Sequence, residues 1–209
     1  MKKAIFSLFI FGAALSASPA SVSFVSATSS IGPYTLSVNG VNTPAMCMDD
    51  FLRVSGSWKA NVTAVSGADF SNTYLGNHTF NIEGYSLTSA NVYGIEAYLF
   101  NQLIQKNTDR TDIQEAAWAV MDPNTMNSVV NTHNTAVINV LLQAANNYSS
   151  FNTSGYQILS EVNPGCNAEQ EFMTQSAATP EPASFALFAA GLVAAGASRF
   201  LRRKKTAVA

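Results

Sequence analysis

Alternating apolar and polar residues predict β-strands in the first part of the chain. Residues 34–38 alternate strictly, and Asn39-Gly40 is a hairpin signal that leads into a second run beginning at Val41. Alternation returns over residues 58–64. Strands of this kind bury one face, so we expect an antiparallel sheet with one side packed against other elements.

Helical periodicity replaces this alternation from about Asp69 onward. Residues 91–107 carry apolar side chains at helical spacing, and a second helix is predicted to start at the capping box Thr111-Asp-Ile-Gln114 and to end at Pro123. A third helix is predicted over residues 127–147.

A return to strand patterning follows the helices. Residues 156–160 are predicted to form a strand, and Phe172 lies in a last strand. The order of strands, helices and strands predicts an α+β fold, in which a helical segment is inserted into an antiparallel β-sheet.

The N-terminus has the pattern of a secretory signal peptide. Lys2 and Lys3 precede an apolar run over residues 4–15, and small residues follow it. We assign residues 1–27 to the signal peptide, with possible cleavage after Ala17, Ala20 or Ala27.

The C-terminus has three consecutive parts. Pro180-Glu181-Pro182 ends the preceding fold, because proline fixes φ and removes an amide donor. Residues 183–197 contain no charged side chain and, continued by two apolar residues, are long enough for a short membrane-spanning helix. A basic cluster then favours the cytoplasmic side of a membrane; its members are Arg199, Arg202, Arg203, Lys204 and Lys205.

This order and spacing resemble the PEP-CTERM sorting signal of Gram-negative bacteria. The resemblance covers residues 179–205 and leaves residues 28–178 as one exported domain. It implies that the helix anchors the chain transiently in the inner membrane. An exosortase-type transpeptidase then cuts near Pro180-Glu181-Pro182 and passes the protein to the cell envelope, the cell surface or an extracellular biofilm matrix.

Charge excludes some partners of the exported domain. Seven of the 11 basic residues lie in the two end segments, which leaves four basic against twelve acidic residues between them, a net charge of about −8. Such a surface repels nucleic acids and anionic lipids. An extracellular polymer or another surface ligand is the expected partner.

The two cysteines allow a disulfide. Cys47 and Cys166 lie near the two ends of the exported domain, and an even number of cysteines in an oxidising compartment favours pairing. Closing so long a loop would stabilise the fold by roughly 4–5 kcal/mol in the chain-entropy treatment.

A second assignment of Cys47 comes from another resemblance. Met46-Cys47-Met48 and the segment from Ile113 through Gln114 to Trp118 resemble the two halves of bacterial Cys–Gln thioester domains, which occur in surface adhesins. The resemblance implies an internal thioester between Cys47 Sγ and the side-chain carbonyl of Gln114, shielded from water by Trp118. A nucleophile such as a surface amine would attack this carbonyl and become covalently attached. Each molecule would react once, so the protein would not be an enzyme.

Simpler roles exist for the same residues. Gln114 fits the capping box, and a helix tryptophan such as Trp118 commonly belongs to a core. No hydrolase signature joins Cys47 to His78 or His133, and no Ca²⁺ loop follows Asp49-Asp50, so we expect no catalytic residues, no metal and no cofactor. The sequence therefore predicts an exported adhesive or structural surface protein. The alternative is a disulfide-stapled, noncovalent matrix or carbohydrate-binding module.

Overall fold

A computed structural model describes residues 18–28, 31–49, 56–82, 85–105, 109–162 and 170–176, with the backbone alone for residues 79–82 and 85–86. The predicted sorting helix and most of the predicted signal peptide lie outside these residues. Within the described part of the chain, no helix is long and apolar enough to cross a membrane.

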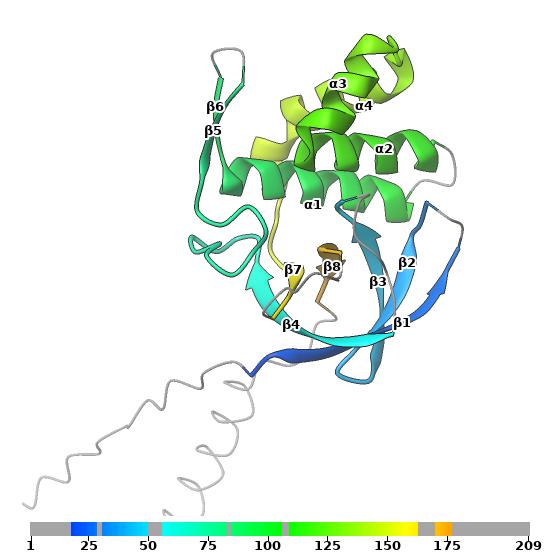
Figure 1. Cartoon of the computed structure of the whole chain (residues 1–209), viewed down its shortest axis with the longest axis vertical. Coiled ribbons are helices and arrows are strands. Elements are labelled where there is room, and N and C mark those ends of the chain that lie inside the picture. Colours follow the sequence, from blue (N-terminus) through cyan, green and yellow to red (C-terminus); the bar gives the residue numbers. More distant parts are fainter. Residues whose placement is uncertain are drawn as a thin grey trace, which may run out of the picture. The chain divides into compact units, whose positions relative to one another are not determined.

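Six antiparallel strands close into a barrel in the order β1-β2-β3-β8-β7-β4 (Figure 1). They are β1 (Ala20–Ala27), β2 (Tyr34–Val38), β3 (Val41–Cys47), β4 (Ser57–Ala64), β7 (Tyr156–Glu161) and β8 (Phe172–Gln175). Pairing of β1 with both β2 and β4 completes the closure. The predicted antiparallel sheet is confirmed, and its closure into a barrel removes exposed sheet edges.

The turn between β2 and β3 confirms the hairpin signal. Asn39 has φ of 51° and Gly40 has φ of 84°. Two successive positive φ values are typical of the tight turn whose twist matches that of the flanking strands.

Between β4 and β7 the chain forms a small hairpin and a group of helices. The hairpin pairs β5 (Thr79–Ile82) with β6 (Tyr85–Thr88). The helices are α1 (Ser89–Gln105), α2 (Arg110–Met121), α3 (Pro123–Asn131), α4 (Thr135–Asn147) and the short 3₁₀ helix η1 (Tyr148–Ser150). Figure 1 shows α1 and α2 crossing one end of the barrel, with α3 and α4 beyond them. The α+β prediction with a helical insertion is thus confirmed.

The single third helix predicted over residues 127–147 is wrong, because two helices occupy this region. α3 starts at Pro123, directly after Asp122, whose side chain accepts a hydrogen bond from the Thr125 amide. The break follows at His133, where φ is 52°, and Asn134 then caps α4 by accepting from the Val137 amide. The capping residues are local signals that apolar periodicity alone does not detect.

The signal-peptide boundary predicted at residue 27 stays a prediction, and its possible cleavage sites differ in their effect on β1. Residues 20–27 form β1, which alone connects β2 to β4 in the barrel. Cleavage after Ala27 would remove this strand, and cleavage after Ala20 would shorten it. Cleavage after Ala17 leaves the barrel whole.

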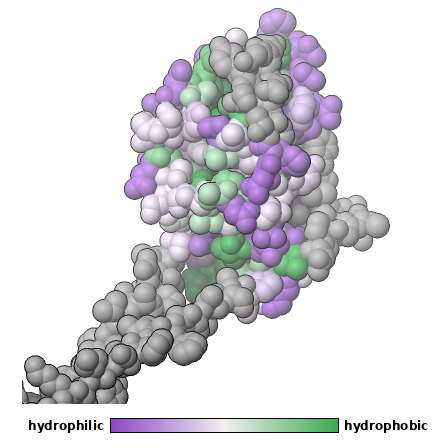
Figure 2. All heavy atoms as spheres, turned by 90° about the vertical axis from the view of Figure 1, so that its left-hand side faces the viewer, coloured by the Kyte–Doolittle hydropathy of each residue, from purple (hydrophilic) through white to green (hydrophobic). Residues whose placement is uncertain are grey.

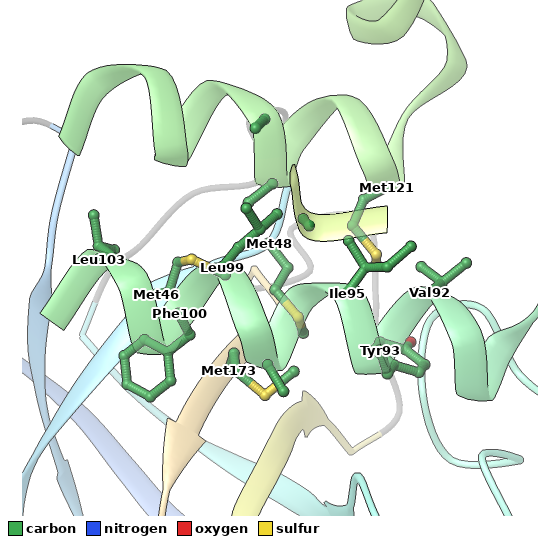
Figure 3. Close-up of a cluster of buried hydrophobic side chains, with 14 of the residues drawn as sticks. Met46, Met48, Val92, Tyr93, Ile95, Leu99, Phe100, Leu103, Met121 and Met173 are labelled. Carbon is green, nitrogen blue, oxygen red and sulfur yellow. The ribbon is translucent and has the colours of Figure 1, made fainter. Parts of the chain in front are cut away.

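Two buried clusters fill the molecule. One lies inside the barrel and contains Leu36, Ala45, Cys47 and Phe172. The other lies between the strands and the helices, where Figure 3 shows Met46, Met48 and Met173 among apolar side chains of α1. Because side chains alternate along a strand, neighbouring residues of β3 face different clusters. Cys47 therefore faces the barrel interior, whereas its neighbours face α1.

The described surface is mixed in polarity. Hydrophilic and near-neutral residues cover most of the face seen in Figure 2, and hydrophobic residues form small separate patches between them. Individually exposed apolar residues such as Tyr74 and Leu142 are ordinary features of a protein surface.

Candidate functional site

Cys47 ends β3 inside the barrel. It pairs with Phe172 of β8, and its side chain is wholly buried. Its thiol is free, and Cys166 lies outside the described residues. The disulfide between these cysteines therefore stays a prediction.

Gln114 of α2 contacts Cys47 directly. The side-chain amide Nε2 donates a hydrogen bond of 2.5 Å to the main-chain carbonyl of Cys47, across 67 residues of sequence. Both residues are wholly buried. The structure thus brings together the two residues that the thioester resemblance predicts as partners.

The capping-box interpretation of Gln114 is wrong. α2 begins at Arg110, and its N-cap is Asp109, which has φ of 64° and makes no side-chain capping bond. Gln114 consequently lies in the second turn of the helix, beyond the backbone amides that need a capping partner. Its side chain is free for the contact with β3.

The Gln114 carbonyl oxygen is isolated from hydrogen-bond donors. Oε1 is buried and has no hydrogen-bond partner among the described residues. Gly32 lies against it: a Cβ added at Gly32 would come within 3.4 Å of Oε1 and 3.2 Å of the Tyr34 ring. Glycine at this position, where φ is 86°, allows the backbone to cover the amide closely.

Two oxygen atoms lie within hydrogen-bonding distance of the Cys47 sulfur. Sγ lies 2.6 Å from the main-chain carbonyl of Asp49 and 2.8 Å from Gln170 Oε1, both hydrogen-bond acceptors for the thiol. Burial raises the pKa of the thiol strongly. Burial, with a smaller effect from Cys47, also raises the pKa of Tyr34 to about 12. The thiol is therefore held in its protonated form.

The Trp118 ring packs against the barrel cluster that contains Cys47. Burial dominates the thiol pKa, and the Trp118 N–H acts against it by lowering this pKa. Nε1 is buried and has no hydrogen-bond partner among the described residues. The shielding of the site by Trp118 stays a prediction.

A hollow of ≈ 380 Å³ adjoins Trp118 on the outer side. α2, α3 and the residue before Gly32 form its walls. Its lining combines an indole, a carboxylate, hydroxyls and an amide, from Ile31, Thr111, Glu115, Trp118, Asn124, Thr125 and Ser128.

Buried acids lie on the opposite face of the strands. Glu171 of the segment entering β8 accepts hydrogen bonds from the Tyr74 amide, the Tyr93 hydroxyl and the Ser160 hydroxyl. Glu96 of α1 is wholly buried, and neither of its oxygens has a hydrogen-bond partner among the described residues. Burial raises the pKa of both carboxyls.

Sequence reasoning missed Gln170 and Glu96. Gln170 precedes β8 and has no local motif, so only the pairing of β8 with β3 brings it to the thiol. Glu96 stands among the apolar residues of α1, and an acid on the buried side of an amphipathic helix was a detectable signal.

The other candidates from the sequence are His133, a metal site and the C-terminal sorting residues. His133 lies in the turn after α3, with its ring Nδ1 3.2 Å from the Asn131 carbonyl. The described residues contain no group of three or more His, Cys, Asp or Glu that could hold a metal ion. Pro180-Glu181-Pro182 and the basic cluster lie outside the described residues.

Comparison with known proteins identifies the C-terminal segment. Residues 178–204 match the family model for the PEP-CTERM protein-sorting motif. No curated protein and no solved structure matches the chain. The chain therefore carries a PEP-CTERM sorting motif, as the sequence analysis predicted from the proline pair, the apolar run and the basic cluster.

Proposed function

We propose that this chain, which carries a PEP-CTERM sorting motif, is a cell-surface protein that attaches covalently to its target through a Cys47–Gln114 thioester. The motif indicates an exported protein that is anchored transiently in the membrane before an exosortase processes it. Its role at the cell surface or in an extracellular matrix is adhesive or structural.

The observation that carries this proposal is the hydrogen bond from Gln114 Nε2 to the Cys47 carbonyl. It holds the Gln114 carboxamide against the main chain of Cys47, and both residues are wholly buried. Attack of Sγ on the Gln114 amide carbon would form the S–C bond. The C–N bond would break, and the thiol hydrogen would leave with the amide nitrogen as ammonia.

Covalent capture of a target would follow when a primary amine cleaves the thioester. A primary amine attacks the acyl carbon of Gln114, the C–S bond breaks, and the surplus amine proton passes to Sγ. The product is a secondary amide on Gln114 and a free Cys47 thiol. Because no step regenerates the thioester from this product, each molecule reacts once and is not an enzyme.

The test is the intact mass of the full chain before and after exposure to methylamine. The proposal predicts a deficit of one ammonia, which methylamine fills at Gln114. Gln114→Asn is the matched variant, because it keeps the amide but shortens the side chain by one methylene. It should show neither the deficit nor the uptake, and Cys47→Ala should behave in the same way.

A chain of full mass that takes up no methylamine would refute the thioester. A deficit of two hydrogens would instead support the disulfide between Cys47 and Cys166. The protein would then be a noncovalent matrix or carbohydrate-binding module, and its partner would be sought by binding to extracellular polymers.

A further inference from the structure

The hollow beside Trp118 is lined by groups that attract a positive charge. Glu115 is the one charged side chain among the described residues that line it, and it is an acid. The Trp118 side chain is only half-buried, so part of its indole ring is left to line the hollow. Indole rings attract cations through their π-systems, and carboxylates accept short hydrogen bonds from them.

Two other side chains of the lining have acceptor oxygens to offer. The Asn124 amide nitrogen donates to Asp122 Oδ1 over 3.4 Å, and the Thr125 hydroxyl donates to Asp122 Oδ2 over 2.9 Å. An amide that donates through its nitrogen still has its carbonyl oxygen, and a hydroxyl that donates keeps its lone pairs. Because Asn124 and Thr125 both line the hollow, these oxygens suit a ligand that brings N–H donors.

The walls of this hollow are continuous with the residues that enclose the Gln114 carboxamide. On α2, Glu115 directly follows Gln114, and Trp118 lies one turn beyond Gln114 on the same face of the helix. Another wall contains Ile31, which precedes Gly32, and a Cβ added at Gly32 would come within 3.4 Å of Gln114 Oε1. The hollow is thus built partly from the immediate chain neighbours of the proposed acyl group.

The charge of the exported domain favours a cationic ligand as well. Four basic residues stand against twelve acidic residues, a net charge of about −8. Such an excess of negative charge raises the concentration of cations near the surface. Primary amines are mostly protonated at neutral pH, so they reach the domain as ammonium groups. A cation with N–H donors therefore matches both the domain and the lining of the hollow.

We propose that this hollow binds the protonated primary amine of the target and presents it to the thioester. The inference rests on the proposed thioester and adds a docking site for its target, an ammonium group held by Glu115 and the Trp118 ring. The bound ammonium gives one proton to water, and the neutral nitrogen then attacks the acyl carbon of Gln114. The C–S bond breaks, and the surplus amine proton passes to Cys47 Sγ.

Glu115→Gln is the test variant, because it removes the charge and keeps a side-chain oxygen for Asn134, whose Nδ2 donates to Glu115 Oε2 over 3.4 Å. Asp112→Asn is the matched control. It removes the same charge from the same helix, and Asp112 lines a different hollow. Exposed charge pairs are weak, so we expect Glu115→Gln to weaken ammonium binding by about 2- to 5-fold. Asp112→Asn should leave binding unchanged.

Binding is measured on the full chain with Cys47→Ala, which cannot form the thioester. Its tryptophan fluorescence is followed during titration with methylammonium chloride, and sodium chloride at equal ionic strength gives the baseline. A saturable change that Glu115→Gln weakens and Asp112→Asn preserves would support the ammonium site. No saturable change, or equal weakening by both substitutions, would overturn the site, whatever the state of the thioester.

The link to the reaction is tested on the wild-type chain, with methylamine uptake followed by intact mass. Trimethylammonium is a cation that forms no stable amide, so it should slow uptake in the wild type and slow it less in Glu115→Gln. Uptake that trimethylammonium leaves unchanged would overturn docking in this hollow as a step of the reaction. A wild-type chain without the ammonia deficit would refute the thioester and this step with it, whereas the titration of Cys47→Ala decides the ammonium site separately.

Discussion

Replacing Glu96 should stabilise the protein, in contrast to most substitutions of buried residues. Glu96 is wholly buried in the middle of α1, and its two oxygens lack hydrogen-bond partners among the described residues. An unsatisfied buried polar group costs about 1–3 kcal/mol. We expect Glu96→Leu to raise the free energy of unfolding by about 1–3 kcal/mol. For a protein of this size, each kcal/mol should raise Tm by about 2–4 °C.

The stabilisation of the protein by Glu96→Leu should increase as the pH rises. Burial raises the pKa of Glu96 well above the ordinary value of 4.5, and the charge of Glu171 adds to the shift. An acid whose pKa rises on folding binds more protons in the native state than in the unfolded state. The stability associated with its neutral form is therefore fully present below pH 4.5 and is lost as the pH rises toward the folded-state pKa. The increase in the free energy of unfolding caused by Glu96→Leu should therefore be largest at pH values above this range.

Urea denaturation at a series of pH values measures both effects. Glu171→Gln is the control, since Glu171 accepts three hydrogen bonds and its replacement should lower stability. The pKa of Glu171 is raised as well, so some decline with pH should persist in Glu96→Leu, with a smaller slope than in the wild type. A loss of stability in Glu96→Leu at neutral pH would refute the assignment of Glu96 as an unsatisfied acid.

Three further predictions follow from the barrel and the site. A chain that begins at Thr28 lacks β1 and should fail to show the cooperative thermal unfolding of a chain beginning at Ser18, as circular dichroism can measure. Gly32→Ala should lower stability by about 1–3 kcal/mol and reduce thioester content by mass, because φ is 86° and the added Cβ crowds Gln114 Oε1. Gln170→Leu removes an acceptor 2.8 Å from Sγ, so after amine cleavage the Cys47 thiol should be alkylated at a different rate from the wild-type thiol, measured with iodoacetamide.

Local patterning predicted most elements of the fold but not its closure. Strand alternation over residues 34–38 and 58–64 and helical spacing over residues 91–107 correspond to β2, β4 and α1. β1 was hidden because its residues follow an apolar run and share its composition, so they were assigned to the signal peptide. Which strands pair across long separations, as β3 and β8 do, depends on tertiary packing that no local pattern encodes.

The candidate site was also predicted only in part. Cys47, Gln114 and Trp118 were identified from short motifs; in the structure Gln114 contacts the main chain of Cys47, and Trp118 packs against the cluster that contains Cys47. Thr111 and Gln114 have the right residue types for a capping box, but the helix begins one residue earlier, so the spacing was a coincidence. Gln170 reaches the thiol only because β8 returns beside β3, which explains why no motif indicated it.

The distribution of buried polar atoms without hydrogen-bond partners bears on the proposed thioester. Local rules of packing and hydrogen bonding are expected to fail where function requires it. In the described part of the chain, the buried side-chain atoms without partners belong to Trp58, Glu96, Gln114 and Trp118. Gln114 donates a hydrogen bond to the main chain of Cys47, and Trp118 packs against the buried cluster that contains Cys47. A carboxamide that is to react with a buried thiol must be kept from water. The buried Oε1 of Gln114, which has no hydrogen-bond partner in the described part of the chain, meets this requirement of the proposed reaction.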